Sequence, residues 1–212
     1  MDLFLSVLAK ISAYSPFLAA LIANKARRNI LWFYLIFGGL AELLGGLLKH
    51  RLEWHYEFLA NTYISGEIVF YMTFFYQNLF RKKFKSYLIA VVLIWQGLFW
   101  IDTFNESKLV MNTSALGLNC LIYTLLSMLT YRMILIRQED EKLSQNPVFW
   151  INTGIFLCSA GGCLFFILLD RVEKENIQFL IMLWMSFYCI INMIRYLFIG
   201  IGLNRLARHE RF

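Results

Sequence analysis

The chain has 212 residues, of which 59% are apolar, 17% aromatic and only 16% charged, with a formal net charge of +6. A soluble domain carries about 25% charged residues, so this composition excludes an ordinary water-soluble protein. The positive charges stand in short runs between apolar stretches, which favours membrane lipids with anionic headgroups as partners over nucleic acid.

Seven mostly apolar stretches have about the 20-residue length with which a helix crosses a bilayer. They predict an all-α fold, a seven-transmembrane-helix bundle that forms one domain over residues 1–212. The first stretch lacks a basic segment before it and contains Lys10, so we expect a retained helix rather than a cleaved signal peptide. The predicted helices cover residues 3–24, 29–49, 58–80, 86–102, 110–136, 147–170 and 177–204.

Lysines and arginines are distributed unevenly between the two sides of this predicted bundle. The richer side carries Lys25, Arg27, Arg28, Arg81, Lys82, Lys83, Lys85, Arg132, Arg137, Lys142, Arg205, Arg208 and Arg211. The other side carries Lys49, Arg51, Lys108, Arg171 and Lys174. Because positively charged loops stay in the cytoplasm, we expect the N-terminus outside and the C-terminus in the cytoplasm.

Small residues and one proline are placed where helix packing would use them. Pro147 opens the sixth helix, where its missing N–H costs nothing. Glycine pairs at 38–39, 45–46 and 161–162 are expected to let neighbouring helices approach closely. The cysteines lie in apolar segments without a C-x-x-C pair, so we interpret them as packing residues. They are Cys120, Cys158, Cys163 and Cys189.

Two glutamates lie inside predicted spanning helices, where a carboxylate is costly and needs a partner. Glu42 is in the second helix and Glu67 in the third, and the antiparallel order of these helices places both in the outer half. Tyr63 and Tyr71 stand four residues before and after Glu67, hence on the same helix face. The following two helices add Gln96 and Asn119 to the outer half.

These side chains predict a polar pocket in the outer half that binds a small molecule or a cation. Its predicted ligand-binding residues are Glu42, Tyr63, Glu67, Tyr71, Gln96 and Asn119. Hydrogen bonds that only join the helices explain the same residues, and the sequence leaves both interpretations open. Lys10 either extends toward the outer headgroups or pairs with Glu42.

A second polar cluster is predicted in the inner half, formed by Asn152 on the sixth helix with Asn192 and Arg195 on the seventh. Asn192 and Arg195 are three residues apart and share one face. One interpretation is that Arg195 extends toward the cytoplasmic headgroups. The other is a polar lock that ties the seventh helix to the sixth and switches between two states.

Motifs for catalysis, cofactors and metals are missing from the sequence. His50 and His55 accompany Glu53 and Glu57 in an outer loop, but their spacing matches no standard metal site. No histidine lies within a predicted helix, and the seventh helix has no lysine to anchor a retinal. We therefore expect no cofactor, no metal and no catalytic residues.

Three segments carry a resemblance to a known group: NTYISGEIVFYMTFFYQNLFRKK, NPVFWINTGIFLCSAGG and CIINMIRYLFIGIG. They resemble a group of uncharacterised seven-helix integral membrane proteins from Bacteroidetes. The residues that carry the resemblance are Tyr63, Glu67, Phe149, Trp150, Gly154, Asn192 and Tyr196. The resemblance implies a bacterial cytoplasmic (inner) membrane and the membrane half of a signalling system.

The sequence thus predicts a membrane protein of sensor or receptor type that binds a small ligand or ion in its outer-half pocket. The tail after the last helix is short, so the signal is expected to pass to a separate cytoplasmic signalling protein. An alternative is a small proton- or cation-coupled transporter that uses Glu42 and Glu67 as coupling sites. An intramembrane lipid-modifying enzyme with the carboxylates as acid and base has less support.

Overall fold

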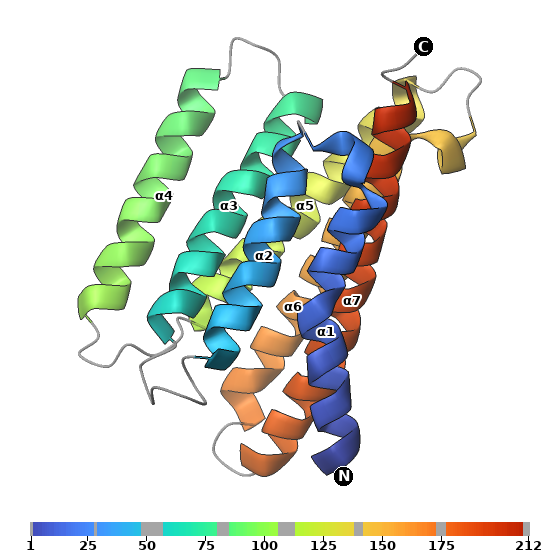
Figure 1. Ribbon diagram of the computed structural model, residues 1–212. Coiled ribbons are helices and arrows are strands. Elements are labelled where there is room, and N and C mark those ends of the chain that lie inside the picture. Colours follow the sequence, from blue (N-terminus) through green and yellow to red (C-terminus); the bar gives the residue numbers. More distant parts are fainter. Residues whose placement is uncertain are drawn as a thin grey trace.

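The computed structural model of the chain describes residues 2–27, 29–47, 57–79, 85–105, 113–137, 142–172 and 177–209. Within these ranges the chain forms seven α-helices and two short 3-10 turns, which confirms the all-α prediction (Figure 1). The helices are α1 (Asp2–Ile22), α2 (Ile30–Leu47), α3 (Glu57–Leu79), α4 (Lys85–Asn105), α5 (Thr113–Arg137), α6 (Pro147–Val172) and α7 (Ile177–His209). The 3-10 turns are η1 (Asn24–Ala26) and η4 (Leu143–Gln145).

Helix boundaries follow the predicted ones closely, because the apolar runs end where charged or loop-forming residues begin. Pro147 is the first residue of α6, as its position predicted, and Asn146 caps that helix by accepting from the Val148 N–H at 2.9 Å. The largest difference is in α7, which continues to His209, beyond the predicted end at residue 204.

Several helices have the length and composition of membrane spans. Among the described residues, three segments are long and apolar enough to cross a membrane: Leu116–Ile136 in α5, Pro147–Phe165 in α6 and Ser186–Arg208 in α7. Shorter apolar segments occupy α1, α2 and α4. Large apolar side chains are also exposed along the sides of the helices, as expected for a protein surrounded by lipid.

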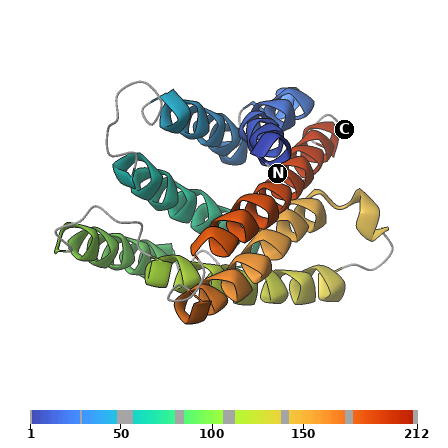
Figure 2. The same ribbon diagram turned by 90° about the horizontal axis from the view of Figure 1, so that it is seen from below.

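The helices run side by side, with the N-terminus of α1 at one end and the C-terminal end of α7 at the other (Figure 1). Helix α7 packs against both α6 and α1, while α5 packs against α6 and α3. Helix α4 stands at the edge of the bundle beside α3 (Figure 1). Seen from the N-terminal end, α6 lies between α7 and α5, and α2 lies beside α1 (Figure 2).

Glycines allow α1, α6 and α7 to approach one another closely. A Cβ atom on Gly154 would lie 2.8 Å from the Arg195 carbonyl oxygen, and one on Gly202 would lie 2.8 Å from the Pro147 carbonyl oxygen. Both distances are below van der Waals contact with a rigid backbone atom. Only glycine therefore fits at these two crossings of α6 and α7.

The predicted glycine contacts are confirmed at three positions. A Cβ on Gly39 would lie 2.6 Å from the Phe17 ring, one on Gly161 would lie 2.6 Å from Ile191, and one on Gly38 would lie 3.0 Å from the Tyr196 hydroxyl. The contacts of Gly38 and Gly39 place α2 tightly against α7 and α1, and that of Gly161 places α6 tightly against α7. At Gly45 the nearest atom is 3.8 Å away, which is ordinary contact.

The half of the bundle at the C-terminal end of α7, called here the closed half, is filled mainly by apolar side chains, with Ser127, Thr130 and Asn152 as buried polar exceptions. Leu35, Phe75, Ile199 and Leu203 are fully buried there, and they come from three different helices. Such a core packs without voids that admit solvent. The opposite half, at the N-terminal end of α1, is hollow and is called here the cavity half.

Candidate functional site

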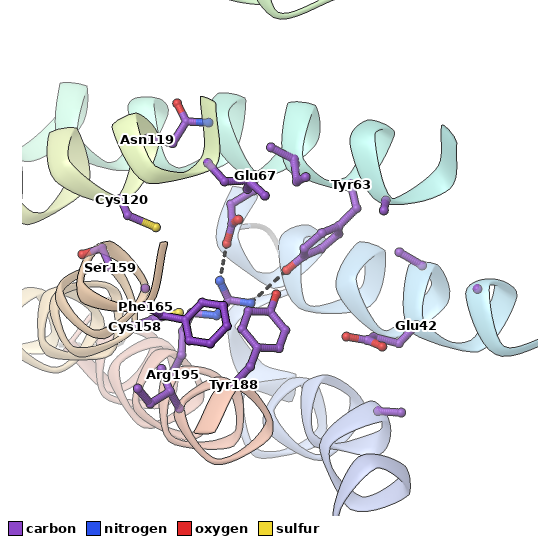
Figure 3. Close-up of a pocket in the computed structure, with 18 of the residues that line it drawn as sticks. Glu42, Tyr63, Glu67, Asn119, Cys120, Cys158, Ser159, Phe165, Tyr188 and Arg195 are labelled. Carbon is purple, nitrogen blue, oxygen red and sulfur yellow. Dashed lines mark hydrogen bonds and ion pairs between the residues drawn. The ribbon is translucent and has the colours of Figure 1, made fainter. Parts of the chain in front are cut away.

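A cavity of about 570 Å³ occupies the cavity half of the bundle (Figure 3). Described residues of α1, α2, α3, α5, α6 and α7 line it, whereas none of the lining residues comes from α4. Most of the wall is apolar. Its apolar residues include Leu59, Ile64, Leu116, Ile155, Phe165 and Ile191.

The mouth of the cavity lies between α1 and α2, which diverge toward this end of the molecule (Figure 1). Lys10 and Tyr14 on α1 and Glu42 and Leu43 on α2 line the cavity and are also exposed. No ion pair joins Lys10 to Glu42 among the described residues. The cavity thus opens sideways, through the wall of the bundle.

Five of the six predicted pocket residues line this one cavity: Glu42, Tyr63, Glu67, Tyr71 and Asn119. The sixth, Gln96, lies elsewhere. Its side-chain amide forms two hydrogen bonds with Ser65 on α3. Nε2 donates to the Ser65 carbonyl at 2.8 Å, and Oε1 accepts from the Ser65 hydroxyl. Gln96 therefore joins α4 to α3 outside the cavity.

A buried ion pair forms the inner end of the cavity. Arg195 on α7 is 3% exposed and donates through Nη1 to the carboxylate of Glu67 on α3, which is 13% exposed (Figure 3). Its Nη2 donates to the hydroxyls of Tyr63 and Tyr196, each at 3.0 Å. The positive and negative charges neutralise each other at a site remote from water.

The expectation that Arg195 extends toward the headgroups is corrected by this pairing. Arg195 lies about 21 Å from the end of α7 at His209, counted at 1.5 Å per residue, which is beyond the reach of its side chain. A carboxylate is available much nearer, on the adjacent face of α3. The guanidinium therefore turns into the bundle.

Tyrosine hydroxyls surround the ion pair and take up most of its hydrogen bonds, while Arg195 Nε has no hydrogen-bond partner among the described residues. Tyr34 on α2 donates to the Glu67 carboxylate at 2.9 Å and shares hydrogen bonds with Tyr71 at 2.9 Å and Tyr63 at 3.1 Å. Tyr63 in turn bonds Tyr196 at 2.7 Å. The Arg195 guanidinium also lies over the Tyr196 ring, 4.7 Å from its centroid. We call these six residues the polar floor: Tyr34, Tyr63, Glu67, Tyr71, Arg195 and Tyr196.

The predicted inner cluster does not form one group of mutually bonded side chains. Asn152 Nδ2 donates to the Ser127 carbonyl on α5 at 3.0 Å. Asn192 Oδ1 accepts from the Cys158 thiol at 3.9 Å. Asn192 thus contacts α6 as predicted, whereas Arg195 belongs to the polar floor and joins α7 to α3.

Two polar side chains on α5 also line the cavity: Asn119, which the sequence predicted, and Tyr123, which it did not. Asn119 and Tyr123 are both 4% exposed and lie one helical turn apart. Asn119 Oδ1 accepts from Trp95 Nε1 at 2.8 Å, but Asn119 Nδ2 and the Tyr123 hydroxyl have no hydrogen-bond partner among the described residues. Such unpaired buried groups are uncommon in folded proteins.

The cysteines and histidines add no second site that the structure describes. All four cysteines are free. Within the described ranges, no group of three or more histidine, cysteine, aspartate or glutamate residues is arranged to hold a metal. His50, His55 and Glu53 of the outer loop lie outside the described residues.

No protein-family model, curated protein or solved structure matches this chain. The arrangement consists of a mostly apolar cavity, an opening in the side of the bundle and a charged but neutralised floor. Such an arrangement is suited to hold a small molecule.

Proposed function

We propose that the chain is an integral membrane protein of sensor or receptor type, whose cavity binds a small ligand. The observation that carries the proposal is the cavity of about 570 Å³ that ends at the polar floor. Small-molecule sites are concave, largely apolar and about 300–1,000 Å³ in volume, with a few placed polar groups. The cavity fits each of these properties.

In this proposal all seven helices cross a bacterial cytoplasmic membrane, with the N-terminus outside and the C-terminus in the cytoplasm. The excess of lysine and arginine on the side of the C-terminus supports this orientation. The placement of the two ends at opposite poles of the bundle is consistent with it (Figure 1). Helix α3 can lie in hydrocarbon because its buried Glu67 is paired with Arg195.

The signal would pass along α7, which runs without a break from the polar floor to the C-terminal end of the bundle. A ligand that changes the hydrogen bonds of Arg195 would alter how α7 sits against α3 and α2. Packed helices respond by small discrete shifts rather than by continuous bending. The output then goes to a separate cytoplasmic signalling protein that contacts the inner end of α7.

The closed half supports a sensor over a transporter. A proton- or cation-coupled transporter needs polar lining on both sides of its site. Beyond the polar floor, Leu35, Phe75, Ile199 and Leu203 fill the space between α2, α3 and α7, and the buried polar side chains of this half, Ser127, Thr130 and Asn152, belong to α5 and α6. The cavity thus has a blind end at the floor.

Spin labels test this proposal directly. Labels at Gln77 and Arg208, exposed positions near the inner ends of α3 and α7, report the distance between these helices. We expect Glu67→Gln and the milder Tyr34→Phe to shift or broaden this distance, and Glu42→Gln at the mouth to leave it unchanged. If the distance stayed unchanged in both Glu67→Gln and Tyr34→Phe, the polar floor would have a structural role only.

Ion flux is the second arm of the test. The purified protein in liposomes should carry no proton or cation current above that of protein-free liposomes. A protein-dependent current that Glu67→Gln abolishes would replace the sensor with the transporter.

A further inference from the structure

We infer that the ligand is an uncharged, mostly apolar molecule of the class of long-chain alcohols, whose hydroxyl donates a hydrogen bond to Glu67 Oε2. This inference rests on the proposed function, since it gives the chemical class of the molecule that the cavity would bind. Three observations carry it: one accessible carboxylate oxygen at the polar floor, the balance of the charges that line the cavity, and its apolar walls.

Only one of the two carboxylate oxygens of Glu67 is used within the polar floor. Arg195 Nη1 and the Tyr34 hydroxyl both donate to Oε1. Oε2 receives no hydrogen bond from a described residue, yet it is not among the unpaired side-chain atoms that are fully buried. The Glu67 side chain lines the cavity and is 13% exposed. Oε2 is therefore open to the cavity.

The other unpaired atoms around the floor are closed to a ligand. Asn119 Nδ2, the Tyr123 hydroxyl and Arg195 Nε are all buried without accessible surface. Nη1 and Nη2 of Arg195 are already bonded to Glu67 and to tyrosines. Because an ionised carboxylate can only accept, the polar end of a ligand that bonds Oε2 must be a donor.

The charges that line the cavity argue for an uncharged donor. Lys10 and Arg195 are balanced by Glu42 and Glu67. An ammonium group at Oε2 would give one carboxylate two cations, and an anion there would face a like charge. Either would add an uncompensated charge at a site remote from water. A hydroxyl leaves the balance as it is.

Lys10 and Glu42 offer an ionic headgroup a place at the mouth, where both are exposed and not paired with each other. With its head there, the chain of an acid, an amine or a zwitterion would extend inward and cover Oε2 with apolar atoms. A charged acceptor without water or a donor costs more than a neutral one. A hydroxyl at the floor avoids this cost, while the two mouth charges remain exposed and extend toward headgroups and water.

The rest of the cavity fits an apolar chain. Its walls include Leu59, Ile64, Leu116 and Phe165, and it opens through the side of the bundle. A molecule with one hydroxyl and a long chain concentrates in the hydrocarbon region of a membrane. The ligand would therefore be drawn from the lipid phase.

Five probes with the same twelve-carbon chain separate the alternatives. The protein in lipid nanodiscs is titrated with radiolabelled 1-dodecanol, dodecyl methyl ether, dodecanoate, dodecylammonium or dodecyl betaine. Empty nanodiscs are the blank, and each affinity is referred to the concentration of the probe in the lipid. We expect saturable binding of the alcohol, one molecule per chain, about tenfold or more tighter than the ether, which lacks the donor.

Two outcomes of this titration would overturn the inference. Equal affinity for the alcohol and the ether would remove the donated hydrogen bond. Equal or tighter binding of the acid, the ammonium or the betaine would replace the uncharged class with an ionic one, and the cavity would remain a ligand site.

Glu67→Gln tests the accepting oxygen through the preference for the alcohol over the ether. Arg195 can only donate, so the amide oxygen stays on its side and the amide nitrogen takes the place of Oε2. The site then donates, the alcohol and the ether can both accept, and the preference should be lost. Glu42→Gln is the matched control, the same chemical change at the mouth, and should keep the preference.

A preference that persists in Glu67→Gln, or that is lost equally in Glu42→Gln, would contradict the inferred bond. If Glu67→Gln does not fold, the alcohol and ether affinities of the unmodified protein decide the question. Absence of saturable binding for all five probes would overturn the inference as well. That result is distinguishable from failure of the proposed function, because the distance between α3 and α7 in the floor variants is measured without any ligand.

Discussion

The two halves of the bundle differ in how the same helices are used. In the closed half, α2, α3 and α7 meet through fully buried apolar side chains such as Leu35, Phe75 and Ile199. In the cavity half the same helices diverge and enclose about 570 Å³. The polar floor lies at the boundary, where Arg195 and Glu67 bridge α7 and α3.

The polar floor therefore both ends the cavity and holds together the helices that surround it. An apolar core needs no directional bonds, whereas helices that separate around a hollow need a specific link where they part. The ion pair, with its tyrosine partners on three helices, provides that link. Changes at the floor should therefore have larger effects than changes at the mouth.

The largest effect is expected for Glu67→Gln, because it leaves the Arg195 charge buried without its counter-ion. The free energy of unfolding should fall by about 3–5 kcal/mol. This loss is measured by unfolding the protein in mixed micelles that contain an increasing share of a denaturing detergent. The double variant Glu67→Gln/Arg195→Met should recover much of this loss, and a double variant less stable than the single one would contradict the pairing.

Gly154→Ala should come next, since its Cβ would lie 2.8 Å from the Arg195 carbonyl oxygen and force α6 away from α7. Overpacking of this kind costs about 1–3 kcal/mol. Gly97→Ala is the control, with nothing within 4 Å of its Cβ, and should stabilise α4 by up to about 1 kcal/mol. Equal melting temperatures for the two variants would show that the crossing of α6 and α7 is not tight.

Tyr34→Phe should destabilise the protein by about 1–2 kcal/mol, because its hydroxyl bonds Glu67, Tyr63 and Tyr71. The comparison is Tyr14→Phe at the exposed mouth, which should stay within about 0.5 kcal/mol of the unmodified protein. Thermal unfolding of the two variants side by side measures the difference. A loss of stability in Tyr14→Phe as large as that in Tyr34→Phe would contradict the distinction between floor and mouth.

The smallest effect is expected for Glu42→Gln. Glu42 is exposed at the mouth and shows no ion pair among the described residues, so stability should change by less than about 0.5 kcal/mol. The same detergent titration serves as the measurement. A loss comparable to that of Glu67→Gln would mean that both carboxylates hold the bundle together.

Much of the fold was predictable because helix length and position are encoded locally. Apolar runs of spanning length mark the helices, and Pro147 marks the start of α6. The grouping of Tyr63, Glu67 and Tyr71 was predictable for the same reason, since four-residue spacing places them on one face of α3. All three line the cavity.

The rest of the site depends on how helices rotate and pack, which one sequence does not encode locally. The partner of Glu67 is Arg195, far away in the chain, and its choice requires α3 and α7 to face each other. Tyr34 stands in an apolar run that looks like ordinary core. Gln96 was placed in the pocket because its depth was known and the rotation of α4 was not.

The polar floor separates an accessible cavity from a closed core, and thiol labelling on α7 tests this separation most directly. Ile191 and Ile199 lie one turn before and one turn after Arg195 on the same helix face, the first lining the cavity and the second fully buried. In a background without the native cysteines, Ile191→Cys in nanodiscs should react with a membrane-permeant maleimide much faster than Ile199→Cys. Reaction of Ile199→Cys at an equal or greater rate would contradict the claim.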